Sequence, residues 1–399
     1  MKPANMAVVL VAAGRGVRAG FETPKQYQAL AGMPVATRTL DALARLLPDA
    51  LIVPVIHPAD QVLFDAAARR SRARNLHAAV AGGATRQVSV LAGLKVLHEE
   101  MRSDIIVLIH DVARPFLTEQ IILRGLNAAA VDGASVPALP VADALKTVDA
   151  GGVLTGVIDR GSARVVQTPQ IFRLGLIYDA HLRAEAAGLT DFADDAAVAA
   201  WAGHPVSTFA GDPDNVKLTT REDFALAEAR LLSELSDIRM GAGFDVHAFG
   251  PGDHVVLGGI SIPHGQGLAG HSDADVLLHA LTDAILGALA DGDIGSHFPP
   301  SDPQWRGAPS RIFLEHAMKL VRARGGMVAH LDATVICEAP KIGPHREALR
   351  RSIAAITGLD IGRVAVKATT TEKLGFTGRG EGIAVQATAT LRLPAGAPA

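Results

Sequence analysis

The sequence predicts an α/β domain with a mainly parallel sheet, followed by a smaller α+β domain, and three observations support this. Residues 1–232 alternate short β-branched apolar runs with longer Ala- and Leu-rich stretches, which is typical of a parallel sheet covered on both faces. Residues 239–399 follow a different order of elements and hold 9 of the 15 histidines. A polar run, LLSELSD, lies between them, so we expect a short linker at 233–238.

Hydrophobic patterning and turn residues give the expected elements of each half. In the first half we expect strands at 7–12, 51–56, 76–80, 104–109 and 134–139, with helices that include 37–46 and 85–97. In the second half we expect strands at 238–246, 327–337, 363–368 and 382–391, a strand pair at 254–262, and helices at 272–290, 310–324 and 344–357.

The composition excludes several classes of protein. A chain of 399 residues with 49% hydrophobic and 20% charged residues is not disordered throughout. The net charge of −3 disfavours a dedicated nucleic-acid binder. One cysteine excludes a disulfide scaffold and fits a reducing compartment, so we expect a cytoplasmic protein. The sequence has no signal-peptide pattern and no run of 18 apolar residues, so we expect no membrane partner.

A glycine-rich loop follows the first expected strand, in the run AVVLVAAGRGVRAG. The loop matches G-x-G-x-x-A, and Asp41 follows about 20 residues later, so a Rossmann-like dinucleotide-binding unit is one hypothesis. Pro24 counts against it, because it interrupts the helix that should follow the glycines. The loop also supplies three cations, Arg15, Arg18 and Lys25. They suit a nucleoside triphosphate, with about four negative charges, better than NAD.

Polar residues also follow two other expected strands of the first half. Gly82, Arg86 and Ser89 stand between a strand and a helix, and Asp111 follows the strand IIVLIH. Ligands of open α/β sheets bind at such strand ends, where an Asp can hold a divalent cation or a ribose hydroxyl. Two isolated cations beside short apolar runs are by themselves ordinary surface charges: Arg160 and Lys217.

A metal site is expected in the second half. Asp245 and His247 are two residues apart in an expected strand, so their side chains share one face. His279 lies in the helix of the run HSDADVLLH, which Ser272 or Asp273 can cap. One carboxylate and two imidazoles form a three-ligand zinc site with an open position, as a Lewis-acid site requires.

The run KATTTEKLGFTGRG is the other polar stretch of the second half. Residues Thr369, Thr370 and Thr371 offer hydroxyl groups, Glu372 offers a ligand for Mg²⁺ or Mn²⁺, and Arg379 offers a charge for a phosphate. The same run also fits a capped turn, which is compatible with a functional role.

The first-half motifs AAGRGVR, GGATRQVSVLAGL, HDVARP, VIDR, TPQ and DNVKLT resemble those of 2-C-methyl-D-erythritol 4-phosphate cytidylyltransferase over residues 6–230. The resemblance implies a Rossmann-like nucleotidyltransferase domain, usually dimeric, that joins CTP to methylerythritol phosphate and releases pyrophosphate. One position departs from the family pattern, since Ala144 follows Asp143 where the family usually has a hydroxyl residue.

The same resemblance implies a role for each matching residue. Arg18 and Lys25 would stabilise charge on the α-phosphate, and Asp111 would support Mg²⁺-CTP and ribose. The remaining residues would cradle the triphosphate (Gly14, Arg15, Gly16), border the cytosine (Gly82, Arg86, Ser89) and hold the acceptor phosphate (Arg160, Lys217).

The second-half motifs GFDVHAF, GHSDADVLLHALTDA, GDIGSHFP, APKIGPH and KATTTEKLGFTGRGEGIA resemble those of 2-C-methyl-D-erythritol 2,4-cyclodiphosphate synthase over residues 239–392. The resemblance implies a homotrimer with sites between subunits, in which a 2-phosphate attacks the β-phosphate of a cytidine diphosphate and CMP leaves. Zinc would bind Asp245, His247 and His279, and a second divalent ion would bind Glu372.

The other matching residues would contact substrate. His271 and Thr370 would position phosphates. The methylerythritol part would contact Asp293, Gly295 and the loop from Phe298 to Asp302, and the cytidine nucleotide would contact Ala339, Lys341, Thr369, Thr371, Phe376 and Arg379.

Together the motifs predict a bifunctional, homo-oligomeric enzyme of non-mevalonate isoprenoid synthesis that catalyses two non-consecutive steps. Two alternatives are an NAD-linked enzyme fused to a metallohydrolase, and a nucleotide-sensing binding module with a zinc-stabilised domain. The cation count disfavours the first, and the shortage of cysteine for a closed four-ligand zinc site disfavours the second.

Overall fold

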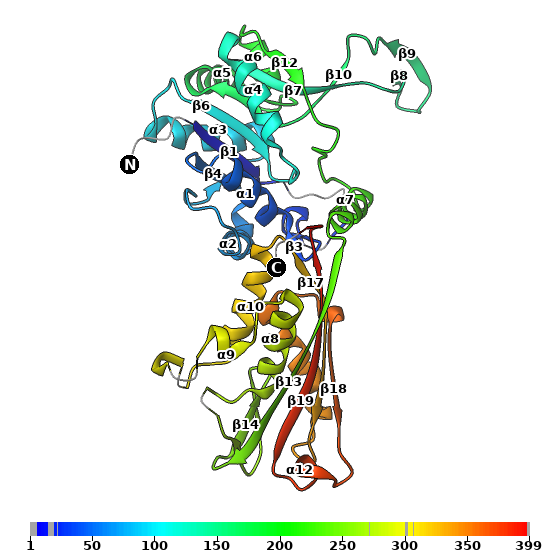
Figure 1. Cartoon of the computed structure of the whole chain (residues 1–399). Coiled ribbons are helices and arrows are strands. Elements are labelled where there is room, and N and C mark those ends of the chain that lie inside the picture. Colours follow the sequence, from blue (N-terminus) through cyan, green and yellow to red (C-terminus); the bar gives the residue numbers. More distant parts are fainter. Residues whose placement is uncertain are drawn as a thin grey trace. The chain divides into compact units, whose positions relative to one another are not determined.

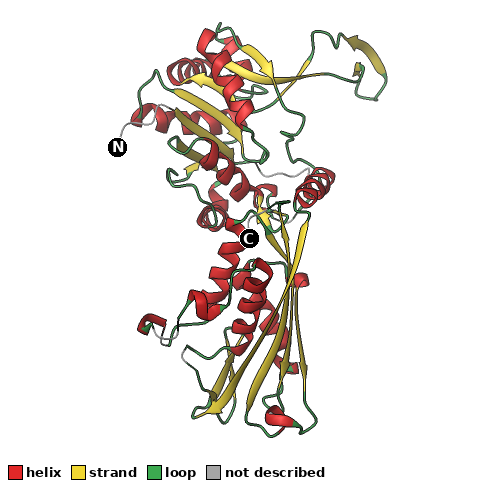
Figure 2. Cartoon of the chain, viewed as in Figure 1, coloured by secondary structure: helices red, strands yellow, loops and turns green. Residues whose placement is uncertain are grey.

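The computed structural model describes residues 6–14, 20–21, 23–270, 272–299, 302–305 and 307–396, except for the side chain of Pro303. The chain divides into two compact units, Met1–Ala227 and Glu228–Ala399 (Figure 1). Helices and strands occur in both units (Figure 2). No helix in the described ranges combines the length and apolar character needed to cross a bilayer.

An eight-stranded sheet forms the centre of the first unit, in the order β10-β7-β11-β6-β1-β4-β5, with β12 paired to β7. The pairs formed by β1 with β4 and β6, β4 with β5, and β7 with β12 are parallel, so the expected mainly parallel sheet is confirmed. Only β10 and β11 run against their neighbours. The strands are β1 (Met6–Ala12), β4 (Leu51–Ile56), β5 (Val80–Ala81), β6 (Ile106–Asp111), β7 (Ala134–Pro140), β10 (Arg164–Val166), β11 (Gln170–Arg173) and β12 (Ser207–Ala210).

Helices cover both faces of this sheet and create a core on each side. Along β1, Val8 and Leu10 belong to one core with Leu40, whereas Val9 belongs to the other core with Leu94. This alternation follows from the two-residue period of a strand. The helices that contribute to these cores are α1 (Val35–Leu46), α2 (Gln61–Arg69), α3 (Arg86–Glu100), α4 (Glu119–Asp132), α5 (Leu174–Ala186) and α6 (Asp195–Trp201), whereas α7 (Arg221–Glu234) spans the division between the two units.

Two short ribbons accompany the sheet. One pairs β2 (Ala29–Leu30) with β3 (Met33–Pro34). The other pairs β8 (Leu145–Val148) with β9 (Leu154–Ile158) and forms an arm that projects away from the sheet (Figure 1). The arm exposes apolar side chains, among them Val157, which is 72% exposed.

The second unit has a five-stranded sheet in the order β16-β13-β19-β17-β18, and a hairpin of β14 and β15. Helices α8, α10 and α11 contribute buried residues to the core beneath this sheet. The strands are β13 (Asp237–Gly250), β14 (His254–Leu257), β15 (Ile260–Pro263), β16 (Gly267–Leu268), β17 (Met327–Ile336), β18 (Val364–Thr369) and β19 (Gly382–Leu393). The helices are α8 (Val276–Leu289), α9 (Ile294–His297), α10 (Arg311–Ala323), α11 (Arg346–Thr357) and α12 (Gly375–Gly378).

Strand β13 lies unusually close to helix α8. A Cβ atom added at Gly241 would lie 2.1 Å from the carbonyl oxygen of Ala284, and one added at Gly243 would lie 2.0 Å from that of Ala280. Only glycine allows this approach. The opposite face of β13 exposes large apolar side chains: Ile238, Met240, Phe244 and Val246.

The helix expected from residue 272 begins later, at Val276. The reason is the backbone of Ala274, whose φ of 57° lies outside the helical region. The expected cap, Ser272 or Asp273, is therefore wrong, and Asp275 caps the helix.

Asp275 is completely buried and fixes the start of α8 against the turn between β14 and β15. Burial raises its pKa to about 6, because the backbone hydrogen bonds oppose the cost of desolvation only in part. Its carboxylate accepts four backbone N–H bonds, from Leu277 (3.2 Å), Leu278 (3.0 Å), Gly258 (2.9 Å) and Gly259 (2.6 Å).

We predict that Asp275→Ala lowers the free energy of local opening at the start of α8 by about 3 kcal/mol, because a helix cap and two further buried hydrogen bonds are lost. Hydrogen–deuterium exchange of the full chain should then accelerate in peptides covering 255–262 and 276–282. The control is Asp360→Ala, which removes an exposed cap bond to Gly362. Equal exchange in the two variants would contradict the prediction.

Candidate active sites

The carboxylate of Asp111 forms the centre of a charged cluster at the end of β6. Its Oδ2 lies 2.6 Å from Nζ of Lys217, and its Oδ1 lies 3.2 Å from Nε of Arg86. Burial alone would raise the pKa of Asp111, but the positive charges of Arg86, Lys217 and Arg114 outweigh burial and lower it. The cluster therefore holds a fixed anion between cations at the strand ends where α/β sheets bind ligands.

Arg86 bridges two carboxylates that are far apart in the sequence. Its Nη1 lies 2.7 Å from Oδ2 of Asp195, whose other oxygen lies 3.2 Å from Nε2 of His181. Asp195 and His181 are buried. Nη2 of Arg86 is also buried and has no hydrogen-bond partner among the described residues. Asp195 and His181 were not predicted from the sequence, because the pair Asp194-Asp195 before an apolar run indicates only a helix cap, which Asp194 provides.

Two residues after Pro24 connect the end of β1 to the DNVKLT segment. Lys25 donates to the carbonyl of Leu218 at 2.6 Å, next to Lys217. Gln26 is buried and donates to the carbonyls of Ala12 (2.9 Å) and Gly14 (3.0 Å). These bonds bring Gly14 and Lys25 to the same edge of the sheet. Three expected residues of this loop lie outside the described residues: Arg15, Gly16 and Arg18.

Gly82 and Ser89 lie beside the same strand end. A Cβ atom at Gly82 would lie 2.4 Å from Cβ of Ala13 and 2.9 Å from Oγ of Ser89, so a larger residue cannot fit. The hydroxyl of Ser89 accepts a bond from Gly83 N–H at 3.1 Å and donates to the Thr85 carbonyl at 2.9 Å. The start of α3 is thereby fixed near Gly14.

Other residues of the first-half motifs lie elsewhere. Arg160 follows β9 on the exposed arm and donates to the carbonyl of Ala142 at 3.1 Å. In the described part of the chain, no hydrogen bond or ion pair joins it to Asp111 or Lys217. Ala144 is exposed just before the arm. Asp41 accepts bonds from Ser71 Oγ and Arg72 N–H, so its carboxylate connects α1 to the end of α2.

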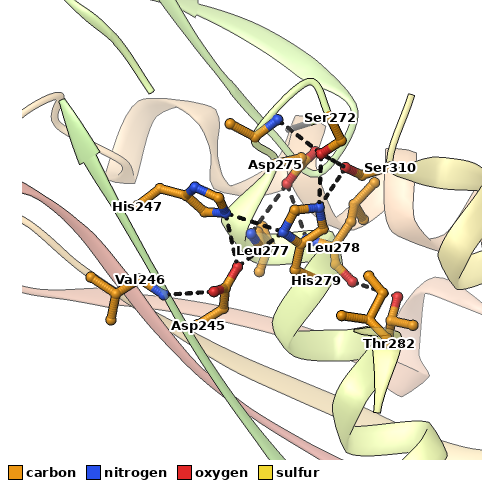
Figure 3. Close-up of polar contacts among 12 residues, drawn as sticks. Asp245, Val246, His247, Ser272, Asp275, Leu277, Leu278, His279, Thr282 and Ser310 are labelled. Carbon is orange, nitrogen blue, oxygen red and sulfur yellow. Dashed lines mark hydrogen bonds and ion pairs between the residues drawn. The ribbon is translucent and has the colours of Figure 1, made fainter. Parts of the chain in front are cut away.

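In the second unit, β13 and α8 bring together three metal-binding groups (Figure 3). Oδ2 of Asp245 lies 3.1 Å from Nε2 of His247 and 3.0 Å from Nδ1 of His279. The two nitrogens lie 3.2 Å apart. Zinc bonds of about 2.0 Å in a tetrahedron place neighbouring donors roughly 3.3 Å apart, so this donor set fits a zinc ion. Three protein donors leave one of the four tetrahedral positions open.

Hydrogen bonds fix both imidazoles of this triad. Nδ1 of His247 donates to the carbonyl of Ala269 at 2.7 Å, which turns its Nε2 toward Asp245. On the far side of His279, Nε2 lies 2.8 Å from Oγ of Ser310. The pKa of Asp245 is lowered, since its bonds to the two histidines outweigh burial, and the pKa of His247 is raised, because Asp245 more than offsets burial.

The KATTTEKLGFTGRG segment forms a separate polar loop. Thr370 donates to Glu372 at 2.7 Å, and Glu372 and Lys373 adopt left-handed backbone conformations with φ of 53° and 65°. Oε1 of Glu338, a residue not predicted from the sequence, accepts from the N–H groups of Thr371 (3.3 Å) and Lys373 (3.2 Å). No hydrogen bond between described residues joins this loop to the triad of its own chain.

The other second-unit residues expected to contact substrate lie mainly in loops and turns. Arg379 pairs with Glu381 at 2.8 Å, and Asp293 caps α9 by accepting from Ser296 at 2.8 Å. Phe298 packs edge-on against Trp305. Gly295 lies in α9, and the carboxylate of Asp302 accepts a hydrogen bond from the N–H of Gln304. Four other expected residues are exposed: Ala339, Lys341, Thr369 and Phe376. Thr371 is partly buried and donates to Leu374, and His271 lies outside the described residues.

Known proteins match the chain over nearly its full length. The family model of 2-C-methyl-D-erythritol 4-phosphate cytidylyltransferase matches residues 6–233, and that of the YgbB family matches residues 238–392. The chain is 57% identical over 391 residues to the bifunctional enzyme IspD/IspF of Rhodopseudomonas palustris, covering 98% of this chain and 97% of that one. The IspD/IspF of Bradyrhizobium diazoefficiens is 55% identical, with 98% of each chain covered.

A solved structure also matches, that of the bifunctional IspDF from Campylobacter jejuni. It is 31% identical and covers 97% of this chain and 98% of that one, with a TM-score of 0.46. The two family models and the identity to full-length relatives lead to one assignment: the chain belongs to the family of bifunctional IspD/IspF enzymes.

Proposed function

We propose that the first unit transfers CMP from CTP to 2-C-methyl-D-erythritol 4-phosphate and releases pyrophosphate. The second unit cyclises 4-diphosphocytidyl-2-C-methyl-D-erythritol 2-phosphate to the 2,4-cyclodiphosphate and releases CMP. The steps are not consecutive, because a phosphate must be added between them. Two observations carry this proposal: the triad of Asp245, His247 and His279 in the second unit, and the charged cluster around Asp111 in the first.

In the first unit, the chemical problem is the approach of two phosphates. An oxygen of the acceptor phosphate attacks the α-phosphorus of CTP, and the bond to pyrophosphate breaks. The acceptor is already ionised, so no protein base is required. Arg18 and Lys25 stabilise the charge that develops, and Lys217 binds the acceptor phosphate. Asp111 supports Mg²⁺-CTP, while other residues surround the triphosphate (Gly14, Arg15, Gly16) or cytosine (Gly82, Arg86, Ser89).

We infer that Arg160 acts in the site of a second subunit. It lies on the exposed arm, without contact to Lys217 of its own chain among the described residues. The arm also exposes apolar side chains such as Leu154 and Val157, which a partner would cover. A two-fold dimer in which arms are exchanged gives each acceptor site one Lys217 and one Arg160 from different chains.

In the second unit, an oxygen of the 2-phosphate attacks the β-phosphorus, and CMP leaves. The triad holds a zinc-like ion, which when bound acts as a Lewis acid toward phosphate oxygens. Glu372 holds Mg²⁺ or Mn²⁺. His271 and Thr370 position the phosphates. The methylerythritol part of the substrate contacts Asp293, Gly295, Phe298 and Asp302. The nucleotide contacts Ala339, Lys341, Thr369, Thr371, Phe376 and Arg379.

We propose a trimer for this unit. The Glu372 loop makes no hydrogen bond with the triad of its own chain in the described residues, so the loop of a neighbouring copy completes each site. The exposed apolar face of β13, with Met240 and Phe244, supports packing of copies against one another. We also propose a cytoplasmic location, which fits the single, buried, free cysteine, Cys337.

Neither alternative from the sequence is favoured. The carboxylate of Asp41 bonds to Ser71 and Arg72 rather than facing a ribose, which disfavours NAD. A structural zinc site has four protein ligands, whereas the described residues offer three here, which disfavours a purely binding module.

Lys25→Ala should slow pyrophosphate release from CTP and methylerythritol phosphate by about 10²–10³-fold, because a charge on the transition state is lost. Cyclisation should be unchanged. The matched control is Lys95→Ala, whose side chain is half-exposed and pairs with Glu185 at 3.5 Å. A similar loss in the control, or loss of both activities in Lys25→Ala, would argue against this role.

Asp245→Ala should remove bound zinc and reduce cyclisation by at least about 10²-fold, since the carboxylate holds both histidines and the ion. Atomic emission measures the zinc, and separate assays measure the two reactions. Asp253→Ala is the control, because Asp253 is 95% exposed in the same unit. Retention of zinc at wild-type content would refute the triad as the metal site.

A dimer containing one Arg160→Ala chain and one Lys217→Ala chain should recover about half of wild-type cytidylyl transfer, because one of its two sites keeps both residues. Each homodimer should be nearly inactive. Two affinity tags allow the mixed dimer to be purified and assayed. An inactive mixed dimer would mean that Arg160 acts within its own chain.

A further inference from the structure

Ser310 makes an unusual set of contacts behind the metal triad. It precedes α10 and is completely buried, but its hydroxyl makes no capping bond to the helix that it precedes. The hydroxyl instead lies 2.8 Å from Nε2 of His279 and within hydrogen-bond distance of Oδ1 of Asp273. Figure 3 shows Ser310 and Ser272 on the side of the His279 ring that faces away from Asp245.

The hydrogen-bond directions follow from the chemistry of the groups. A carboxylate accepts only, and Asp273 already accepts from the backbone N–H of Ser310 at 3.0 Å. The hydroxyl proton of Ser310 therefore points to Asp273, which leaves its oxygen lone pairs for His279. Nε2 of His279 must then carry the proton and donate it, so Nδ1 has a free lone pair directed at the triad.

We propose that Asp273 and Ser310 are positioning residues that select the metal-binding tautomer of His279. This inference rests on the proposed metal site but concerns residues outside the ligand set. Without the Ser310 hydroxyl, Nε2 keeps only the contact to Ser272, and the Asp245 carboxylate, 3.0 Å from Nδ1, favours a proton on that nitrogen, so a fraction of molecules presents an N–H group to the ion. Such supporting bonds typically contribute 10–100-fold to metal affinity.

Neighbouring hydroxyl groups provide comparisons. Ser272 lies 3.1 Å from Nε2 of His279, but it also accepts from the N–H of Ala274, and no carboxylate contacts it in the described residues. Thr282 is buried one turn further along α8, and among the described residues its hydroxyl bonds only to the carbonyl of Leu278, at 2.7 Å. Removal of the Thr282 hydroxyl therefore disturbs the same helix without removing a hydrogen bond to a metal-binding residue.

The test is zinc affinity of the full chain, measured by competition with a chromophoric chelator after removal of metal. Ser310→Ala should weaken zinc binding by about 10–100-fold. Ser310→Thr, which keeps the hydroxyl, should restore most of the affinity, and Ser272→Ala should have a smaller effect than Ser310→Ala. Thr282→Val is the matched control and should bind zinc like the wild type. Thermal unfolding of each metal-free variant shows whether it is folded.

The outcomes separate this proposal from the proposed function. Wild-type affinity in Ser310→Ala, or an equal loss in Thr282→Val, overturns the positioning role while leaving the metal site intact. A wild-type chain that binds no zinc overturns the metal site, and the positioning role with it. If Ser310→Ala does not fold without metal, the zinc affinities of Ser310→Thr and Asp273→Asn provide the test instead. The positioning role requires that Ser310→Thr bind zinc nearly as tightly as the wild type and that Asp273→Asn bind it more weakly.

Discussion

The second unit depends on how closely the backbone of β13 approaches α8. At Gly241 and Gly243 a side chain would meet the helix carbonyls, so the strand and helix are held at a separation that no other residue permits. Asp245 and His247 follow on the same face of the strand, opposite His279. Three donor atoms about one zinc-ligand spacing apart are the direct consequence of this packing.

In the first unit, ion pairs between distant segments position the side chains of the site. Lys217, Asp111, Arg86 and Asp195 alternate in sign, and each carboxylate is buried. Removing one member of such a series leaves an uncompensated buried charge, so each charge favours the retention of its neighbours in the cluster. The positive groups are thus held in place before a polyanionic substrate arrives, and little reorganisation is needed when charge develops.

Local patterns predicted most strands and the metal triad, because both depend on short spacings such as that of Asp245 and His247. Contacts between distant segments could not be predicted. Arg86 meets Asp195 across 109 residues, and His279 meets Ser310 across 31. Spacing within a motif also cannot show whether a residue such as Arg160 reaches its own site. The late start of α8 depends on one left-handed residue, Ala274, whose conformation alanine does not favour.

The loop of Glu372 has an unfavourable backbone conformation that is offset in part by a residue outside the loop, Glu338. Two consecutive non-glycine residues in the left-handed region cost roughly 1–2 kcal/mol each, and bonds to the carboxylate of Glu338 contribute roughly 1.5–3 kcal/mol apiece. The two quantities are similar in size, so the bonds to Glu338 contribute substantially to the shape of the loop. Because Glu338 stabilises this shape, the binding of any ligand that prefers the same shape is energetically linked to the Glu338 carboxylate.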